Sequence, residues 1–331
     1  MKRRNFLKGM AAAPLLASGG AFPVQKGVLF NDVHTGLNPT GVASIARPTS
    51  AAEVQSLVKD CGKHSRAISV SGSRHAASGQ QFATKSVLLD TRAMNRIIGL
   101  DDKSGVLHVE AGIEWPELIK GYLSLQKENV NWGIRQKQGG ADRMSLGGTL
   151  SANAHGHGLG SPPIVGDVEW IEIVTADGSV KKCSRKENAE LFSLAVGGYG
   201  LFGIIAALGL RLVPRRKVRR HVETRTTAEL IALLEGRTAA GAPYGYFQYS
   251  IDETSADFLR AGILTTYENV SPETPLGTES SDIDTYNRFA ARHELASAYA
   301  QFQDFLDLKK QYDPRETFQS DWYRYYGGLY A

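Results

Sequence analysis

The sequence predicts an α+β fold in two lobes, and three observations support this. The chain has 331 residues, which at roughly 150 residues per domain favours two lobes over one. Between residues 45 and 214, short stretches with strand periodicity alternate with stretches of helical periodicity, and glycine-rich turns separate them. After Pro214 the apolar alternation weakens and polar segments lengthen. We therefore expect one α+β lobe before Pro214 and another after it.

The first half of the lobe before Pro214 begins with a helix and continues with strands. Ser50 followed by Glu53 has the spacing of a capping box. Apolar residues then recur at helical spacing, namely Val54, Leu57, Val58 and Cys61. The segment 67–73 predicts a strand that runs into a glycine turn. Further strands are expected within 86–101 and 105–112, joined by a turn at 101–105.

The second half of the lobe reads in the same way. A helix is expected over 114–125. The segment 170–184 alternates apolar and polar residues on both sides of Asp177-Gly178, which predicts a hairpin. A short helix follows at 188–197, with Asn188 as its expected cap, and a strand runs from 203 to Pro214. Beyond it we expect a helix at 227–236, a strand at 244–251, an exposed polar linker at 269–285 and a helix over 288–312.

Composition excludes several classes of protein. A net charge of +4 is small for this length, and the basic cluster at residues 215–220 indicates a solvated junction better than a nucleic-acid surface. No apolar run reaches 18 residues, so we expect no transmembrane helix and no stable membrane insertion. Cys61 and Cys183 fit neither a zinc spacing nor a disulfide framework, and are expected to be buried thiols. We expect no nucleic-acid partner.

The first 21 residues have the layout of an export signal. Arg3 and Arg4 precede a short, weakly apolar stretch and then small residues up to Ala21. The hexamer RRNFLK resembles the bacterial twin-arginine signal, which directs folded proteins out of the cytoplasm. We therefore expect a periplasmic or extracellular protein; the alternative is a basic N-terminus on a cytoplasmic one.

Three glycine-rich segments are candidates for holding a phosphate. GYGLFG at 198–203 matches G-x-G-x-x-G, but a helix is expected before it and a strand after it, the reverse of a dinucleotide fold. We interpret it as a helix-to-strand turn. SGSRHAASGQ at 71–80 follows a strand and offers successive backbone N–H groups beside small side chains. SLGGTLSANAHGHG at 145–158 is similar. His155 and His157 alone make a poor metal site, so we expect no metal.

Read in order, these segments resemble a known family. PTSAAEVQSLV, VSGSRHAASGQ, LLDTRAMNRI, SLGGTLSANAHGHG, WIEIVTADGSV and NAELFSLAVGGYGLFGII are similar to the FAD-binding domain of the vanillyl-alcohol oxidase superfamily (the PCMH type), nearest its aldonolactone and alditol oxidase branch. The resemblance implies a two-lobed FAD-binding domain at 38–215, a shortened α+β substrate domain with a polar linker at 216–285, and a C-terminal segment at 286–331 that returns to the FAD-binding domain.

The resemblance also implies site residues. His75 stands where many relatives attach FAD covalently; the alternative is a histidine that only hydrogen-bonds within its loop. The implied FAD-binding residues are Ser71, Gly72, Ser73, Arg74, His75, Gly79 and Gln80 from the first loop, Gly147, Gly148, Ser151, Asn153, His155 and Gly156 from the second, and Gly203 and Ile204. The candidates for catalytic contacts near the flavin ring are Tyr286, Asn287 and Arg288.

The implied reaction is oxidation of a CH–OH group of a small alcohol or lactone by hydride transfer to flavin N5, with oxygen or another electron acceptor completing the cycle. The sequence departs from the pattern after residue 268, where it passes through the polar linker to a segment similar to the family's C-terminus. Two alternatives therefore stay open. One is a flavin-binding protein with little turnover, and the other is a dehydrogenase resembling cytokinin dehydrogenases that uses another acceptor.

Overall fold

The computed structural model describes residues 27–126, 131–251, 256–275, 302–320 and 323–324. The expected export signal at 1–21 and the end of the polar linker lie outside these residues. Tyr286, Asn287 and Arg288 lie outside them as well. In the described part of the chain, no helix is long and apolar enough to cross a membrane.

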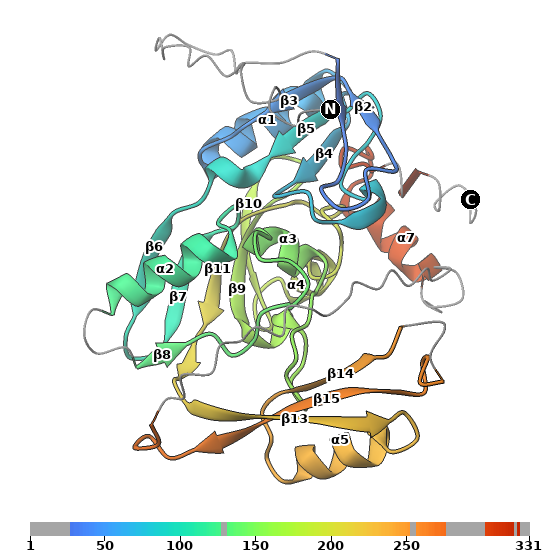
Figure 1. Ribbon diagram of the computed structural model, residues 1–331. Coiled ribbons are helices and arrows are strands. Elements are labelled where there is room, and N and C mark those ends of the chain that lie inside the picture. The colour runs from blue at the N-terminus through green and yellow to red at the C-terminus, as the bar shows by residue number, and fades with distance from the viewer. Residues whose placement is uncertain (1–26, 127–130, 252–255, 276–301, 321–322, 325–331) are drawn as a thin grey trace, which may run out of the picture.

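A small parallel sheet stands at the N-terminal end of the molecule (Figure 1). Its strand order is β3 (Ser44–Ala46), β5 (Val87–Asp90), β4 (Ile68–Ser71). Helix α1 (Ala51–Lys63) packs beside it and buries the expected apolar face, Val54, Leu57, Val58 and Cys61. Helix α1 and the parallel sheet share one core, so the end of β4 is held in a fixed position. The loop after β4 therefore begins from a rigid support.

The start of α1 confirms half of the expected capping box. The Ser50 hydroxyl accepts from the N–H of Glu53 at 3.3 Å. The Glu53 carboxylate, however, accepts from the N–H of Thr49 at 2.7 Å and not from that of Ser50. The Glu53 carboxylate therefore fixes Thr49, which is one residue earlier in the chain than the Ser50 N–H that a capping box would bind.

A five-stranded antiparallel sheet forms the middle of the molecule (Figure 1). Its order is β10 (Val180–Ser184), β9 (Val168–Val174), β11 (Ile204–Arg211), β7 (Val106–Glu110), β6 (Ile97–Asp101). The expected hairpin is confirmed as β9–β10, in which Val174 faces Val180. Three helices cover its core: α2 (Trp115–Leu125), α3 (Leu146–Ser151) and α4 (Ala189–Ala195).

Two expectations about the segment before β11 have different outcomes. The GYGLFG stretch lies between α4 and β11, so the helix-to-strand turn is confirmed. Gly203 at its end has φ +142°, and a β-carbon there would lie 2.7 Å from the Val174 carbonyl oxygen, so only glycine fits. Asn188 stands at the N-cap position of α4 as expected, but its side chain makes no capping bond and donates instead to the Lys182 carbonyl at 2.7 Å.

A three-stranded antiparallel sheet forms the second lobe, at the bottom of Figure 1. Its order is β13 (Lys217–Thr226), β15 (Ala261–Val270), β14 (Gly245–Tyr249), and α5 (Leu230–Ala239) covers one face. Sequence patterns missed β13 and β15, because polar residues stand on both faces of β13. The basic cluster expected to be only a junction therefore runs into this strand.

Short elements complete the fold. An N-terminal pair, β1 (Val28–Phe30) and β2 (Thr40–Val42), lies beside the parallel sheet, and β8 (Trp132–Gly133) pairs with β12 (Val213–Pro214). Three 3-10 turns span Ala77–Gly79, Thr91–Ala93 and Ile164–Asp167. Helix α7 (Phe302–Tyr312) buries Leu306 in the core of the five-stranded sheet.

The segment after α7 returns to the first lobe. Ile68 of β4 donates to the Thr317 carbonyl at 2.6 Å, and the N–H of Gln319 donates to the Ile68 carbonyl at 2.7 Å. Phe318, at the centre of this contact, is 1% exposed. The C-terminal segment thus extends the parallel sheet and braces the strand that leads into the first glycine loop.

Candidate functional site

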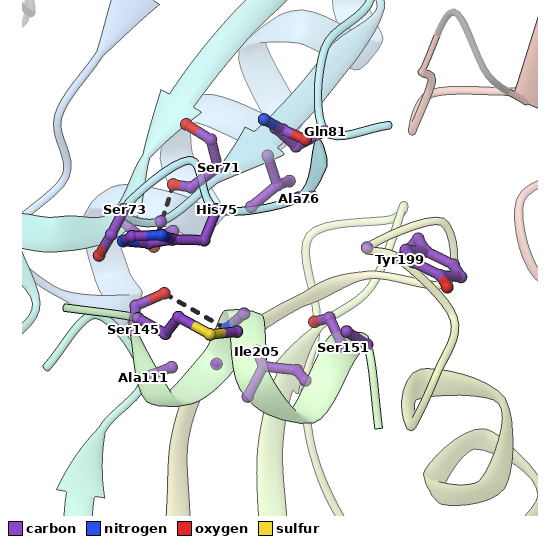
Figure 2. Close-up of a pocket in the computed structure, with 18 of the residues that line it drawn as sticks. Ser71, Ser73, His75, Ala76, Gln81, Ala111, Ser145, Ser151, Tyr199 and Ile205 are labelled. Carbon is purple, nitrogen blue, oxygen red and sulfur yellow. Dashed lines mark hydrogen bonds between the residues drawn. The ribbon is translucent and has the colours of Figure 1, made fainter. Parts of the chain in front are cut away.

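A cavity of about 170 Å³ lies where the first lobe's two sheets meet. The loop after β4 forms one wall, α3 forms the facing wall, and the turn before β11 closes one side (Figure 2). Most of the lining residues are small; the full set is Val70, Ser71, Gly72, Ser73, Arg74, His75, Ala76, Gln81, Thr91, Ala111, Met144, Ser145, Gly147, Gly148, Ser151, Ala152, Tyr199, Gly200, Gly203 and Ile205.

The loop after β4 presents free hydrogen-bond donors. Among the described residues, no acceptor pairs with the backbone N–H groups of Ser73, Arg74, His75 and Ala76. Arg74 has φ +62°, and a left-handed residue within a short run turns successive N–H groups toward a common side. A concave run of this kind binds anionic oxygen atoms.

Helix α3 differs, because its first N–H groups are already used. Leu146 donates to the Ile113 carbonyl at 2.8 Å, and Gly147 donates to the Ala111 carbonyl at 2.7 Å. Gly148 donates to the Ser145 hydroxyl at 3.3 Å. Gly147 and Gly148 therefore line the cavity by leaving space, while the donors come from the opposite loop.

The two walls approach each other most closely at Gly72. A β-carbon on Gly72 would lie 1.9 Å from the Ser145 hydroxyl oxygen and 2.8 Å from the Ser145 β-carbon. Such distances are far inside van der Waals contact, so any larger residue would push α3 and the loop apart. Glycine at 72 is thus needed for the walls to meet.

His75 makes a close contact that the sequence did not indicate. Its Nδ1 lies 2.9 Å from Nε2 of His34, which belongs to the exposed segment between β1 and β2. Burial lowers the pKa of His75 below its ordinary value of 6.5, and the adjacent His34 lowers it further. The backbone of Arg143 and the charge of Glu114 act in the opposite direction but do not outweigh them. His75 is therefore a neutral imidazole at neutral pH.

Glu114 holds the two walls around His75. Its carboxylate accepts from the Ser73 hydroxyl at 2.7 Å and from Arg143 at 3.1 Å. Backbone pairing of Glu114 with Ser145 then connects the start of α2 to the start of α3. Ser73, although in the cavity wall, therefore directs its hydroxyl to Glu114.

Buried polar atoms of Gln81 and Arg74 at the cavity have no hydrogen-bond partner among the described residues. Both amide atoms of Gln81 are buried and unbonded within the part of the chain that the structure describes. The Nε of Arg74 is also buried and unbonded, although its Nη1 donates to the Asn31 carbonyl at 3.2 Å. Buried polar groups are almost always hydrogen-bonded, so the Gln81 amide indicates a missing polar ligand.

The structure brings most of the expected FAD-binding residues together. The cavity wall contains Ser71, Gly72, Ser73, Arg74, His75, Gly147, Gly148, Ser151 and Gly203. The others stand apart. Gly79 packs against Asn38, and Gln80 lies outside the lining residues. Ile204 faces the core around α1, so the next residue, Ile205, is the one that reaches the cavity.

Three further expected residues lie along the loop beyond α3. Asn153 accepts from the N–H of Val165 at 3.4 Å, His155 is exposed, and Gly156 packs against the Lys137 backbone. Sequence reasoning also missed several members of the wall, among them Gln81, Thr91, Ala111, Met144 and Tyr199. Two of these had a signal: Gln81 adjoins the expected Gln80 in the same turn, and Tyr199 lies in the GYGLFG segment.

The chain is similar to a known family model and to several known proteins. The family model described as FAD binding domain matches residues 42–184. An uncharacterized oxidoreductase, ORF5 in the fasciation locus of Rhodococcoides fascians, is 30% identical over 167 residues, which cover 50% of this chain and 36% of that protein. Mitochondrial L-galactono-1,4-lactone dehydrogenase of Brassica oleracea is 26% identical over 205 residues, which cover 60% and 33%. The chain thus spans about a third of the length of these two relatives.

A solved structure shares the fold. Alkyldihydroxyacetonephosphate synthase superposes with a TM-score of 0.60 at 18% identity, over 71% of this chain and 48% of that one. At this identity the similarity concerns the fold alone, and it agrees with the predicted mixture of helices and sheets.

Proposed function

The chain carries an FAD binding domain at residues 42–184, and on this premise we propose that the protein is an FAD-dependent oxidoreductase acting on a CH–OH group. The substrate class is a sugar-like alcohol or an aldonolactone. Support comes from the lactone dehydrogenase among the relatives and from the chemistry of the cavity wall.

Two features of the cavity wall fit FAD. Gly72, Gly147 and Gly148 lack side chains where the two walls approach, so a ligand can lie against backbone. The buried Gln81 amide offers both a donor and an acceptor without a partner, and a flavin ring edge presents both kinds of group. A buried amide without hydrogen bonds is costly, and a polar cofactor would satisfy it.

The observation that carries the proposal is the free N–H run from Ser73 to Ala76. A pyrophosphate needs several donors at one place and no nearby carboxylate with free oxygen atoms. The charge of Glu114 acts on this loop at His75, and the oxygen atoms of Glu114 already accept from Ser73 and Arg143. We infer that this loop holds the pyrophosphate and that α3 supplies space on the other side.

When bound, FAD supplies the two-electron chemistry by accepting a hydride from the substrate carbon. We propose that His75 also attaches the cofactor covalently through the 8α-methyl carbon. Attachment replaces one methyl hydrogen by an imidazole nitrogen, a two-electron oxidation for which dioxygen is the oxidant. A neutral imidazole is required, and burial beside His34 keeps His75 in that form.

Flavin content and turnover test this function separately. The full chain is purified, its flavin is identified in the released or digested fraction, and oxidation of aldonolactones and alditols is followed by oxygen uptake and by dye reduction. FAD with oxygen uptake supports an oxidase, and FAD with dye reduction alone supports a dehydrogenase. FAD without turnover on any of these compounds would leave a flavin-binding protein, and absence of FAD would overturn the proposal.

Gly72→Ala is expected to weaken FAD binding about tenfold or more, because the new methyl group overlaps Ser145 and overpacking costs about 1–3 kcal/mol. Ser145→Gly removes both atoms in conflict. The double variant should therefore regain part of the binding lost by Gly72→Ala, as measured by fluorescence titration of flavin-free protein.

Gly140→Ala is the matched control, since nothing lies within 4 Å of a β-carbon at that position. It should bind FAD like the unaltered protein. If Gly72→Ala lost the same FAD affinity with and without Ser145→Gly, the contact between the two walls would not set that affinity.

A further inference from the structure

A second and larger space lies between the FAD binding domain and the three-stranded sheet. It measures about 1050 Å³, slightly above the roughly 300–1,000 Å³ typical of small-molecule sites. Backbone hydrogen bonds join its two walls at one edge: Leu159 donates to the Pro243 carbonyl at 3.0 Å, and Gly245 donates to the His157 carbonyl at 2.9 Å. We call this space the interlobe cleft.

The sheet wall of the cleft is rich in tyrosine. Tyr244, Tyr246 and Tyr267 stand on one face of the sheet and line the cleft. The opposite face is covered by α5, where Arg237 pairs with Glu223 at 2.9 Å (Figure 1). The face of the sheet that carries the tyrosines therefore lies opposite the FAD binding domain across the cleft, and α5 packs against the other face.

The other side of the cleft is basic. Four cationic side chains line it, and no Asp or Glu is found among the described lining residues. Arg135 pairs with Asp167 at 3.1 Å, and Lys137 pairs with Asp142 at 3.0 Å. The remaining two, Arg215 and Arg216, are exposed and pair with no carboxylate in the described part of the chain.

The two unpaired arginines lie next to neutral hydroxyl groups. Burial raises the pKa of Tyr122, whose hydroxyl feels the charge of Arg215, and burial likewise raises that of Tyr244 beside Arg216. The hydroxyls are thus protonated at neutral pH. The cleft therefore combines apolar ring surfaces and hydroxyl groups with two positive charges that have no carboxylate partner in the described part of the chain. The Tyr244 hydroxyl already donates to the Arg135 carbonyl at 2.7 Å.

We propose that the interlobe cleft binds a small organic anion, a polyhydroxyl compound with a carboxylate or phosphate group that Arg215 and Arg216 hold. Guanidinium groups pair with both kinds of oxyanion in bidentate geometry, and the tyrosines suit the uncharged body of such a molecule. This inference goes beyond the proposed function, because the interlobe cleft shares no described lining residue with the cavity between α3 and the loop after β4.

Binding to the flavin-loaded full chain tests the proposal by calorimetry. The probes are D-gluconate for a carboxylate, D-glucose 6-phosphate for a phosphate ester, and D-glucose as the neutral counterpart. We expect at least one anion to bind about tenfold or more tightly than glucose. Which of the two binds tells a carboxylate site from a phosphate site.

The decisive variant is Arg215→Gln with Arg216→Gln, which should weaken binding of the anion about tenfold or more and leave the flavin content unchanged. The control, Lys63→Gln with Lys186→Gln, removes the same charge from exposed positions outside the cleft and should bind as the unaltered protein does. Equal binding of glucose and both anions, no binding of either anion, or equal loss in both variants would overturn the proposal. Because flavin content is measured separately, failure of the FAD-based function is seen independently.

Discussion

His75→Ala is expected to abolish covalent flavin while leaving FAD bound reversibly. The free donors that we assign to the pyrophosphate are backbone N–H groups of Ser73 to Ala76, and alanine keeps all of them. After acid denaturation, yellow colour and flavin fluorescence should pass from the protein pellet to the supernatant. His64→Ala, at the exposed end of α1, should keep the colour in the pellet.

The attachment should also depend on pH in a defined direction. A protonated imidazole has no free electron pair for bond formation, and the pKa of His75 is lowered below 6.5 by burial and by His34. When flavin-free protein is mixed with FAD, the rate of attachment should fall as the pH is lowered, with a midpoint below pH 6.5. A midpoint at or above pH 6.5 would contradict a depressed pKa. Colour retained in the His75→Ala pellet would exclude this residue as the attachment point.

Asp313→Ala is expected to be the most destabilising single change in the C-terminal segment. Asp313 is 0% exposed and accepts from Lys309 Nζ at 2.7 Å and from the N–H groups of Thr317 and Phe318, each at 2.8 Å. Lys309 is itself 0% exposed. Removing one partner of a buried ion pair costs about 3–5 kcal/mol, so the midpoint of thermal unfolding should fall on the order of 10 °C.

A double variant separates charge burial from lost backbone bonds. Lys309→Met with Asp313→Asn removes both charges and keeps an amide oxygen that can accept from Thr317, so it should be more stable than Asp313→Ala. Asp304→Ala removes an exposed acid from the same helix and should change the midpoint little. If Asp313→Ala unfolds at the same temperature as Asp304→Ala, the pair does not fasten the segment to β4.

The order of elements in the first lobe was predictable because it depends on local signals. The apolar face of α1, the turn at Asp177-Gly178 and the strand of Ile204 to Arg211 each follow from periodicity within a few residues. The second lobe was harder. Strand β13 alternates between a face toward the cleft and a face toward α5, and neither face is a simple apolar row.

By itself, then, the sequence determined where the strands and helices of the first lobe lie, which glycine loops stand at their ends, and that His75 falls in one of them. Only the tertiary structure decided that Ile205 and not Ile204 reaches the cavity. It also decided that the first N–H groups of α3 donate to the Ala111 and Ile113 carbonyls, and that His34 contacts His75. The physical reason is that periodicity is a property of neighbouring residues, whereas a cavity wall and its free donors depend on contacts between segments distant in the chain.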